Sequence, residues 1–344
     1  MLTPEDKKLG EIIFRLLKNA TSQSVVKEFL KTKRVPISAA NWDELFTKRI
    51  EPALTQKQFT IDEFRSLLQS VEEYGRQHCF LFTCTPSRAQ ALLKTTRIES
   101  LAKELGIDGL LKKPLDLELP NEPTIVDLRI INPDPTKEPA GLVIKIVEVR
   151  RIRKFSSEDV DQLTGDLIKR YTFTEKRSVS IAHLRSDGFL ELRIASQDNQ
   201  TRYHDLVRAM LGKISTLIPH DGFAIYSLSA AKAKIYKDRV GLAQDLRYST
   251  STARNDLGAV MQLSSSAQED NLSDDDGSMG ALDTFLGLDG HVTGTNVFVR
   301  IPNMTPEREV HLLISGDLNE FAVPAACSEG EYAYVREKVV SLNS

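Results

Sequence analysis

The sequence predicts an α+β protein, and three observations lead to this fold class. Apolar side chains recur at helical spacing through residues 1–75, which predicts a small N-terminal helical bundle. Strand-like runs of β-branched and aromatic residues are interspersed with helical stretches through residues 76–248, which predicts a central mixed sheet domain with flanking helices. Residues 249–296 are expected to form a flexible acidic linker, because residues 264–277 within them are rich in serine and aspartate and poor in apolar residues. Strand-like runs return in residues 297–344, where we expect a small β element.

The first helix of the bundle has a clear start. Thr3 suits the capping position and Pro4 the first helical position, and one face of the helix is apolar. Further helices are expected over residues 24–31, 40–50 and 61–74. The bundle contains no cluster of charged residues typical of an active site, so we expect it to bind a protein partner.

The aromatic residues of the bundle have two interpretations. Trp42, Phe46 and Phe64 lie at positions that face the interior of their predicted helices. Buried aromatic side chains of this kind stabilise a core more often than they anchor a partner. We therefore expect these three residues to form core.

The central domain contains one strong turn signal and several predicted elements. Asp187 and Gly188 separate two strand-like runs, which is typical of a β-hairpin. Residues 142–149 are mostly apolar and β-branched, which predicts a buried strand. Ser156 predicts a helix start, with the helix over residues 159–170. The remaining expected strands lie over 78–84, 125–131, 223–228, 233–240, 297–301, 310–315, 320–323 and 332–340, and the remaining expected helices over 87–93, 98–105 and 202–218.

Length and composition limit the class of protein. A chain of 344 residues corresponds to about two or three modules. No apolar run approaches the roughly 20 residues that span a bilayer, so we expect no membrane partner. The polar start does not resemble a signal peptide, and three cysteines do not suggest a disulfide framework. We therefore expect a soluble protein of the cytoplasm, or of the nucleus if the source is eukaryotic.

The net charge of −3 conceals an uneven distribution. Residues 255–344 carry 4 basic and 15 acidic side chains, a net charge of −11, and the other residues carry a net charge of +8. This asymmetry suggests a polyanion-binding body with an acidic appendage, and one hypothesis is that the acidic segment around residues 269–276 folds back over the basic surface and masks it. The alternative is that the acidic segment is a solvated linker.

A group of basic residues in the central domain is the leading candidate for a binding surface. Arginine and lysine side chains on a sheet can follow the phosphates of a DNA or RNA backbone. Aromatic residues for base stacking are few, which favours contact with a duplex or a backbone over single strands. The alternative is an ordinary charged sheet face. The candidate residues are Lys145, Arg150, Arg151, Arg153, Lys154, Lys169, Arg170, Lys176 and Arg177.

One pattern is compatible with metal-dependent nuclease chemistry. Asp127 lies on one predicted strand, and Glu148 and Arg150 lie on the next. Two carboxylates at such positions can hold a divalent cation, but the usual lysine is replaced by arginine, which stays protonated. The alternative is that these residues belong to the polar face of a sheet.

Other catalytic and cofactor motifs are absent from the sequence. Cys79 and Cys84 are five residues apart on a predicted strand, so they face opposite ways and cannot share a zinc ion. The sequence has no P-loop, dinucleotide fingerprint or nucleophile elbow. We predict no cofactor and no metal. The leading function is a non-catalytic, nucleic-acid-associated scaffold or adaptor within a multiprotein assembly; the alternatives are a protein–protein adaptor and a metal-dependent nuclease.

Overall fold

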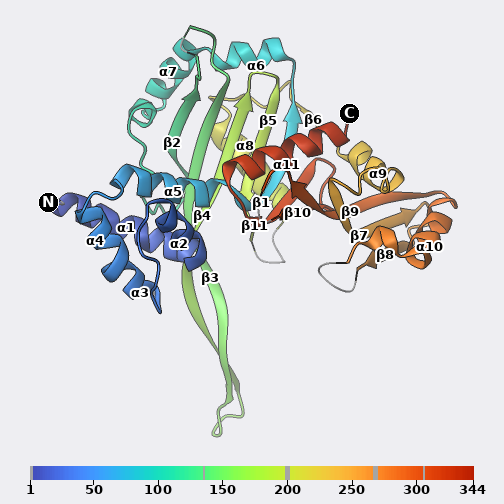
Figure 1. The fold of residues 1–344 in the computed structure, drawn as a ribbon, viewed down its shortest axis with the longest axis horizontal. Coiled ribbons are helices and arrows are strands. Elements are labelled where there is room, and N and C mark those ends of the chain that lie inside the picture. The colour runs from blue at the N-terminus through green and yellow to red at the C-terminus, as the bar shows by residue number, and fades with distance from the viewer. Residues whose placement is uncertain (1–2, 135, 198–201, 266–269, 305–306) are drawn as a thin grey trace. The chain divides into compact units, whose positions relative to one another are not determined.

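The computed structural model describes residues 3–134, 136–197, 202–265, 270–304 and 307–344 (Figure 1). It confirms an α+β protein with a central sheet. The chain divides into two compact units. The first unit comprises Met1–Gln69, Asp108–Arg129 and Ile144–Ser180, and the second comprises Ser70–Ile107, Ile130–Val143 and Ile181–Ser344.

The helices at the start of the chain form the predicted bundle. They are α1 (Pro4–Ala20), α2 (Gln23–Thr32), α3 (Trp42–Leu45), a π-helical turn (Phe46–Ile50), α4 (Glu51–Thr55) and α5 (Ile61–Glu73). The helix start predicted at Thr3 is confirmed, because the Thr3 hydroxyl accepts a hydrogen bond from the Asp6 amide at 3.1 Å.

Aromatic side chains fill the interior of the bundle. The Phe14 ring contacts Trp42 and Phe46, with ring centroids 5.7 and 4.7 Å apart. Phe64 is fully buried and packs against Phe59. The prediction that these aromatic residues form core is therefore confirmed for Phe64, whereas Trp42 and Phe46 are only half-buried.

Among the described residues, eleven strands form one sheet in the order β2-β3-β4-β5-β1-β11-β10-β9-β7-β8, with β6 paired to β1. The neighbours of β1, which are β5, β6 and β11, all run antiparallel to it. The strands are β1 (Gly75–Thr83), β2 (Thr124–Ile131), β3 (Gly141–Val160), β4 (Leu167–Arg185), β5 (Phe189–Ala195), β6 (Ala224–Ile225), β7 (Leu246–Asn255), β8 (Val260–Ser264), β9 (Gly290–Ile301), β10 (Arg308–Ile314) and β11 (Glu320–Ala326).

The second unit contains most of the other helices and a large apolar core. Tyr332 and Val335 from the last helix pack in this core with Phe321 of β11 and Val299 of β9. The helices are α6 (Pro86–Leu93), α7 (Thr95–Glu104), α8 (Tyr203–Ile214), α9 (Ser229–Lys237), a 3₁₀ turn (Leu272–Asp274), α10 (Asp276–Leu286) and α11 (Glu329–Leu342). A further 3₁₀ turn, Asp108–Leu111, belongs to the first unit.

The predicted hairpin at Asp187 and Gly188 is confirmed, since β4 and β5 flank it. Gly188 has φ +101°, and a Cβ atom there would overlap the carbonyl oxygen of Cys84. Both constraints require glycine at this position.

The helix predicted over residues 159–170 is wrong, because this segment is the end of a long hairpin formed by β3 and β4. The Asp161 carboxylate accepts hydrogen bonds from the amides of Leu163 and Thr164, and Gly165 has φ +75°. An aspartate that bonds to amides two and three residues ahead, followed by a glycine in the left-handed region, makes a tight turn. These local interactions replace the helix that Ser156 was expected to cap.

The stretch expected to be a flexible linker, residues 249–296, differs from its prediction. Its described part contains most of β7, all of β8 and α10, and the start of β9. The Asp275 carboxylate caps α10 by accepting hydrogen bonds from two amides, and Leu282 of α10 is fully buried. Serine and threonine fit the strand β7 because their short side chains suit a half-buried, pleated surface.

This arrangement also bears on the masking hypothesis. The acidic segment 255–344 supplies β11, which pairs with β1 over Gly75 to Phe80. The acidic residues therefore belong to a folded unit with its own core. Removing residues 255–344 would take away strands of the sheet, so it would not be a clean test of masking.

Two further strand predictions are wrong. Residues 332–340 lie in α11, where Ser328 and Glu331 form a reciprocal capping box at the helix start. Residues 233–237 lie in α9, whose alanine and lysine content favours a helix.

A charged group is buried within the second unit. The Arg193 guanidinium lies 2.9 Å from the Glu191 carboxylate, and the two side chains are 3% and 1% exposed. The Tyr332 hydroxyl donates to Glu191 at 2.9 Å, and Arg193 donates to the carbonyl of Glu73 at 2.6 Å. Burial alone would raise the pKa of Glu191, but Arg193 and nearby cations hold the pKa of Glu191 below its ordinary value.

Candidate functional site

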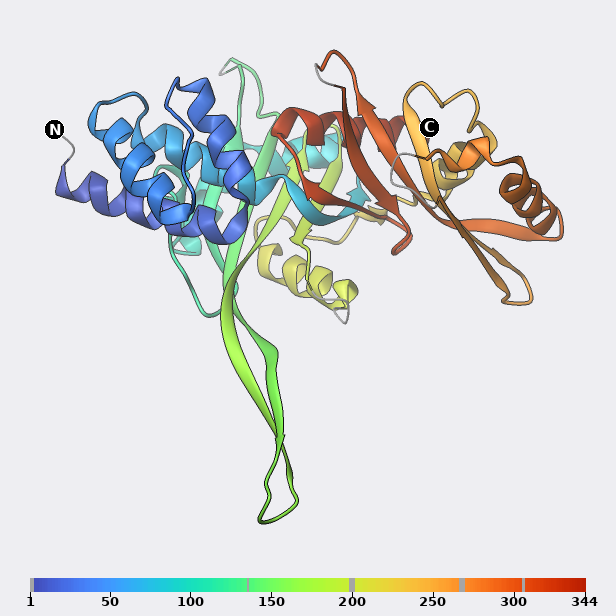
Figure 2. The ribbon, with the colours of Figure 1, turned by 60° about the horizontal axis from the view of Figure 1, so that its bottom comes forward.

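The outer parts of β3 and β4 form a two-stranded ribbon, defined here as residues 150–177. Figures 1 and 2 show this ribbon continuing past helices α1–α5 of the same unit. The side chains of residues 151–156 and 162–176 are exposed. Because these exposed side chains have little contact with a core, their surfaces are accessible to another molecule.

One face of the ribbon carries aromatic side chains. Alternate residues of a strand share a face, so Arg151, Arg153 and Phe155 lie together. The Arg153 guanidinium lies 4.2 Å from the Tyr171 ring centroid, and the rings of Phe155 and Tyr171 are 5.9 Å apart. Arg151 pairs with Glu175 at 3.4 Å. These contacts define the aromatic face as Arg151, Arg153, Phe155, Tyr171, Phe173 and Glu175.

The opposite face carries cations. By the same alternation, Arg150 and Lys154 of β3 lie together, as do Arg170 and Lys176 of β4. Isoleucine and threonine occupy the positions between them. Lys154, Arg170 and Lys176 are exposed, and Arg150 forms an ion pair with Glu148. We call Arg150, Lys154, Arg170 and Lys176 the cationic face.

The remaining predicted cations have other environments. Lys145 is 1% exposed, so it does not belong to an accessible surface. Arg177 donates hydrogen bonds to the carbonyls of Asp116 and Glu118. These hydrogen bonds connect the base of the ribbon to the segment that precedes β2. Lys169 pairs with Glu158 at 3.4 Å near the tip.

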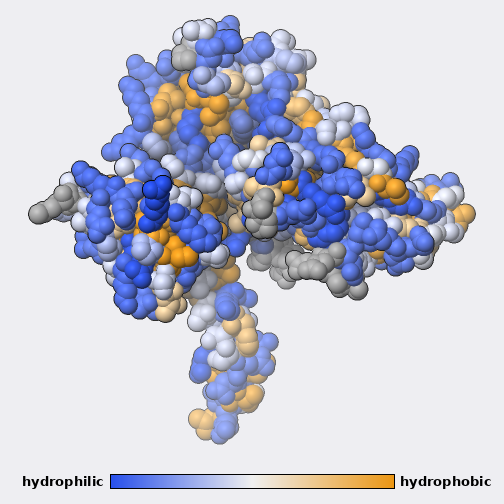
Figure 3. All heavy atoms as spheres, viewed as in Figure 1, coloured by the Kyte–Doolittle hydropathy of each residue, from blue (hydrophilic) through white to orange (hydrophobic). Residues whose placement is uncertain are grey.

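The tip of the ribbon differs from its shaft. Residues 158–166 contain four acidic side chains and no basic one. Leu163 is 97% exposed at the turn, and Val160 and Leu167 beside it are also exposed. Figure 3 shows hydrophilic and hydrophobic residues interleaved along the ribbon. The basic side chains of the shaft thus suit an anionic ligand, whereas the acidic and apolar side chains of the tip do not.

Both carboxylates of the nuclease hypothesis form an ion pair with an arginine. The Asp127 carboxylate lies 2.7 Å from Arg129, and Glu148 forms its ion pair with Arg150. Within the part of the chain that the structure describes, no group of three or more His, Cys, Asp or Glu side chains is arranged to hold a metal ion. The nuclease alternative stays a prediction that this geometry does not favour.

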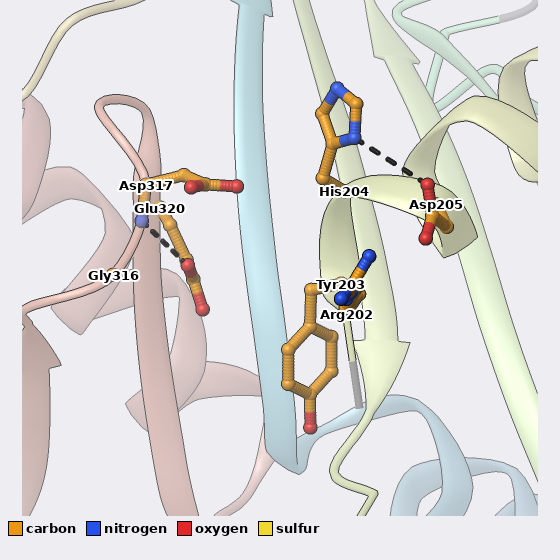
Figure 4. A pocket seen from close by; sticks show the side chains of 7 residues that line it. All are labelled: Arg202, Tyr203, His204, Asp205, Gly316, Asp317 and Glu320. Atoms are coloured by element: carbon orange, nitrogen blue, oxygen red, sulfur yellow. Dashed lines mark hydrogen bonds and ion pairs between the residues drawn. The ribbon is translucent and has the colours of Figure 1, made fainter. Parts of the chain in front are cut away.

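The second unit contains a polar hollow that the sequence analysis did not identify. The His78 Nδ1 atom of β1 lies 2.5 Å from the Glu320 carboxylate of β11, and the Tyr203 ring stacks on His78 with centroids 3.9 Å apart. Figure 4 shows Asp317 and Glu320 on one side of β1 and Arg202 to Asp205, at the start of α8, on the other. The hollow has a volume of about 420 Å³.

Both carboxylate oxygens of Glu320 have partners. One contacts His78 and the other accepts a hydrogen bond from the Asp317 amide at 2.8 Å. A Cβ atom at Gly316 would overlap this carboxylate, so a larger residue there would displace the Glu320 side chain. Because His78 and Glu320 are 242 residues apart in the chain, no local pattern indicates their contact.

No protein-family model matches the chain, and no curated protein sequence matches it. Among the described residues, no helix combines the length and apolar character needed to cross a membrane.

Proposed function

We propose that the protein is a non-catalytic nucleic-acid-associated scaffold whose β3–β4 ribbon contacts the phosphate backbone of a duplex. The observation that supports this proposal is the cationic face, on which Arg150, Lys154, Arg170 and Lys176 share one side of a projecting ribbon. Acidic side chains are absent from this face between residues 150–154 and 170–176, since the acidic Glu175 lies on the other face.

The dimensions of a duplex suit such a ribbon. The major groove of DNA is about 12 Å wide and admits a two-stranded β-ribbon. Lysine and arginine side chains of the ribbon would then approach phosphates on the groove walls and release bound counterions. Threonine at positions 172 and 174 of the same face adds hydroxyl donors, which contact phosphate oxygens in many complexes.

The first test is charge reversal on this face. In fluorescence anisotropy with a duplex of about 20 base pairs and low salt, Lys154→Glu, Arg170→Glu and Lys176→Glu together should weaken binding at least about 100-fold. Exposed residues change in this variant, so its circular dichroism spectrum and melting temperature should match the wild type.

The matched control makes the same change in net charge at positions outside the ribbon. Lys8→Glu, Lys103→Glu and Lys213→Glu alter three exposed lysines outside the ribbon. This variant should keep affinity within about threefold of the wild type, since phosphate contacts would be unchanged. Equal weakening in both triple variants would show that only net charge matters, and the proposed interface would be rejected.

The aromatic face separates duplex from single-strand binding. If bases stacked on Phe155, Tyr171 and Phe173, removing the rings would cost about 1–3 kcal/mol per base. The proposal predicts that Phe155→Ser with Phe173→Ser leaves duplex affinity within about threefold. Loss of binding in this variant, with normal binding by the charge-reversed variant, would contradict the duplex interface.

The second candidate function, a protein–protein adaptor, is favoured by the ribbon tip. Leu163 is 97% exposed and lies among acidic side chains. Exposed apolar groups rimmed by charges often mark protein contacts. The partner surface predicted on the N-terminal helices stays a prediction. A cytoplasmic or nuclear location is also part of this proposal, and it is supported by the free thiols of Cys79, Cys84 and Cys327.

A further inference from the structure

An apolar hollow lies beside the polar one in the second unit. It has a volume of about 600 Å³, within the range of about 300–1,000 Å³ that small-molecule sites occupy. Phe80 and Phe82 of β1, Val207 and Leu211 of α8, and Leu318 of the β10–β11 turn supply apolar surface to this hollow.

The backbone holds the hollow open in a fixed shape. The Leu81 amide of β1 donates to the Asn319 carbonyl at 3.0 Å, and the Asn319 side chain donates back to the Leu81 carbonyl at 2.8 Å. The Leu228 amide donates to the Leu318 carbonyl at 2.8 Å. These bonds fix the turn on one side of β1, so a ligand would meet a preformed site.

The walls of the hollow expose apolar side chains. Phe80 is 1% exposed, whereas Ile225 and Leu318 are 57% and 51% exposed. Exposed apolar area of this kind favours a ligand with an apolar body, because its burial removes that area from water.

The rim of the hollow carries an excess of basic groups. His204 and Arg208 lie on α8, and His220 lies after it. Arg208 forms a long ion pair with Asp205, at 3.9 Å, and its guanidinium lies 3.5 Å from the Nε2 atom of His204. His204 and Asp317 line both hollows, and Arg202 adds a cation to the polar one.

We propose that the apolar hollow binds a small carboxylic acid with an apolar body, whose carboxylate meets Arg208 and the histidines at the rim. An arginine guanidinium binds a carboxylate through two parallel hydrogen bonds, which gives the head group its selectivity. The Phe82 ring and the exposed side chains of Ile225 and Leu318 contact the body of the ligand. This site is independent of the ribbon.

The test is calorimetric titration of the full chain with three probes of equal length: decanoate, decanol and decylammonium. Decanoate should bind at least about tenfold more tightly than decanol, and decylammonium more weakly than either. Arg208→Gln should weaken decanoate about tenfold and leave decanol unchanged. Equal binding of the three probes, or no binding of decanoate at millimolar concentration, would overturn the proposal.

A second pair of variants tests the location. Ile225→Glu with Leu318→Glu places carboxylates on the apolar walls and should abolish decanoate binding. Val240→Glu with Leu288→Glu changes two residues that are 81% and 71% exposed and do not line the hollow. This control pair should bind decanoate as the wild type does. If both pairs bind equally, the ligand does not occupy this hollow.

Discussion

Removal of the Glu191 carboxylate should destabilise the second unit strongly. Glu191 is 1% exposed at its side chain and neutralises Arg193, which is 3% exposed. In Glu191→Ala the guanidinium keeps its hydrogen bond to the Glu73 carbonyl and its contacts with the rings of Tyr74 and Tyr332. The Glu73 carboxylate also raises the pKa of Arg193, but the direct ion pair that compensates for desolvation of the guanidinium would be lost.

The magnitude follows from the cost of an unpaired buried charge. Two unit charges about 4 Å apart interact by about 4 kcal/mol at the effective dielectric constant of protein sites. Breaking a buried pair costs about 3–5 kcal/mol in total, and Tyr332 loses its acceptor as well. Against a total stability of about 5–15 kcal/mol, Glu191→Ala removes about a fifth or more.

Urea denaturation followed by far-ultraviolet circular dichroism measures this loss. Glu191→Leu with Arg193→Met should recover most of the stability, because an apolar pair needs no partner. Glu28→Ala, which breaks an exposed pair with Lys31, should cost less than about 1 kcal/mol. A loss of less than about 1 kcal/mol in the free energy of unfolding for Glu191→Ala would refute the claim that Glu191 compensates for the buried charge of Arg193.

Two further predictions concern single residues of the second unit. Burial lowers the pKa of His183 to about 4, so the unfolded chain binds a proton that the folded chain does not between about pH 6.5 and 4. Stability should therefore fall by at most about 3 kcal/mol as pH drops through this window, and His183→Gln should flatten this slope in urea titrations at several pH values. Gly188→Ala should lower the melting temperature, because Gly188 has a positive φ and the added Cβ atom would overlap the carbonyl oxygen of Cys84. Gly212→Ala should instead stabilise α8 by about 0.5–1 kcal/mol, because no atom lies within 4 Å of the added Cβ atom. A melting temperature that rises in both glycine variants would contradict the strain at Gly188.

The sequence predicted features that depend on local interactions. The helix start at Thr3 and Pro4 and the hairpin at Asp187 and Gly188 both rest on residues adjacent in the chain. The apolar run at residues 142–149 predicted a buried strand, and these residues lie in the buried part of β3. In each case the prediction rests on residues that are neighbours in the chain.

Features that depend on distant residues were not predictable in this way. The pair of His78 and Glu320 and the pair of Glu191 and Tyr332 join strands or helices far apart in sequence. The ribbon carries no periodic apolar face, because it has no core to cover, so its end resembled a helix start at Ser156. The capping box of Ser328 and Glu331 is a local signal that could have identified α11.

The salt dependence of duplex binding tests the central claim most directly. Each phosphate contact lowers the slope of log K against log salt by about 0.9, so four cations on the cationic face predict a slope of about −3 to −4. With Lys154, Arg170 and Lys176 reversed to glutamate, the salt dependence should become shallower, with a slope of about −1, or binding should vanish. A slope that stays the same in this variant, with affinity retained, would show that the ribbon does not contact nucleic acid.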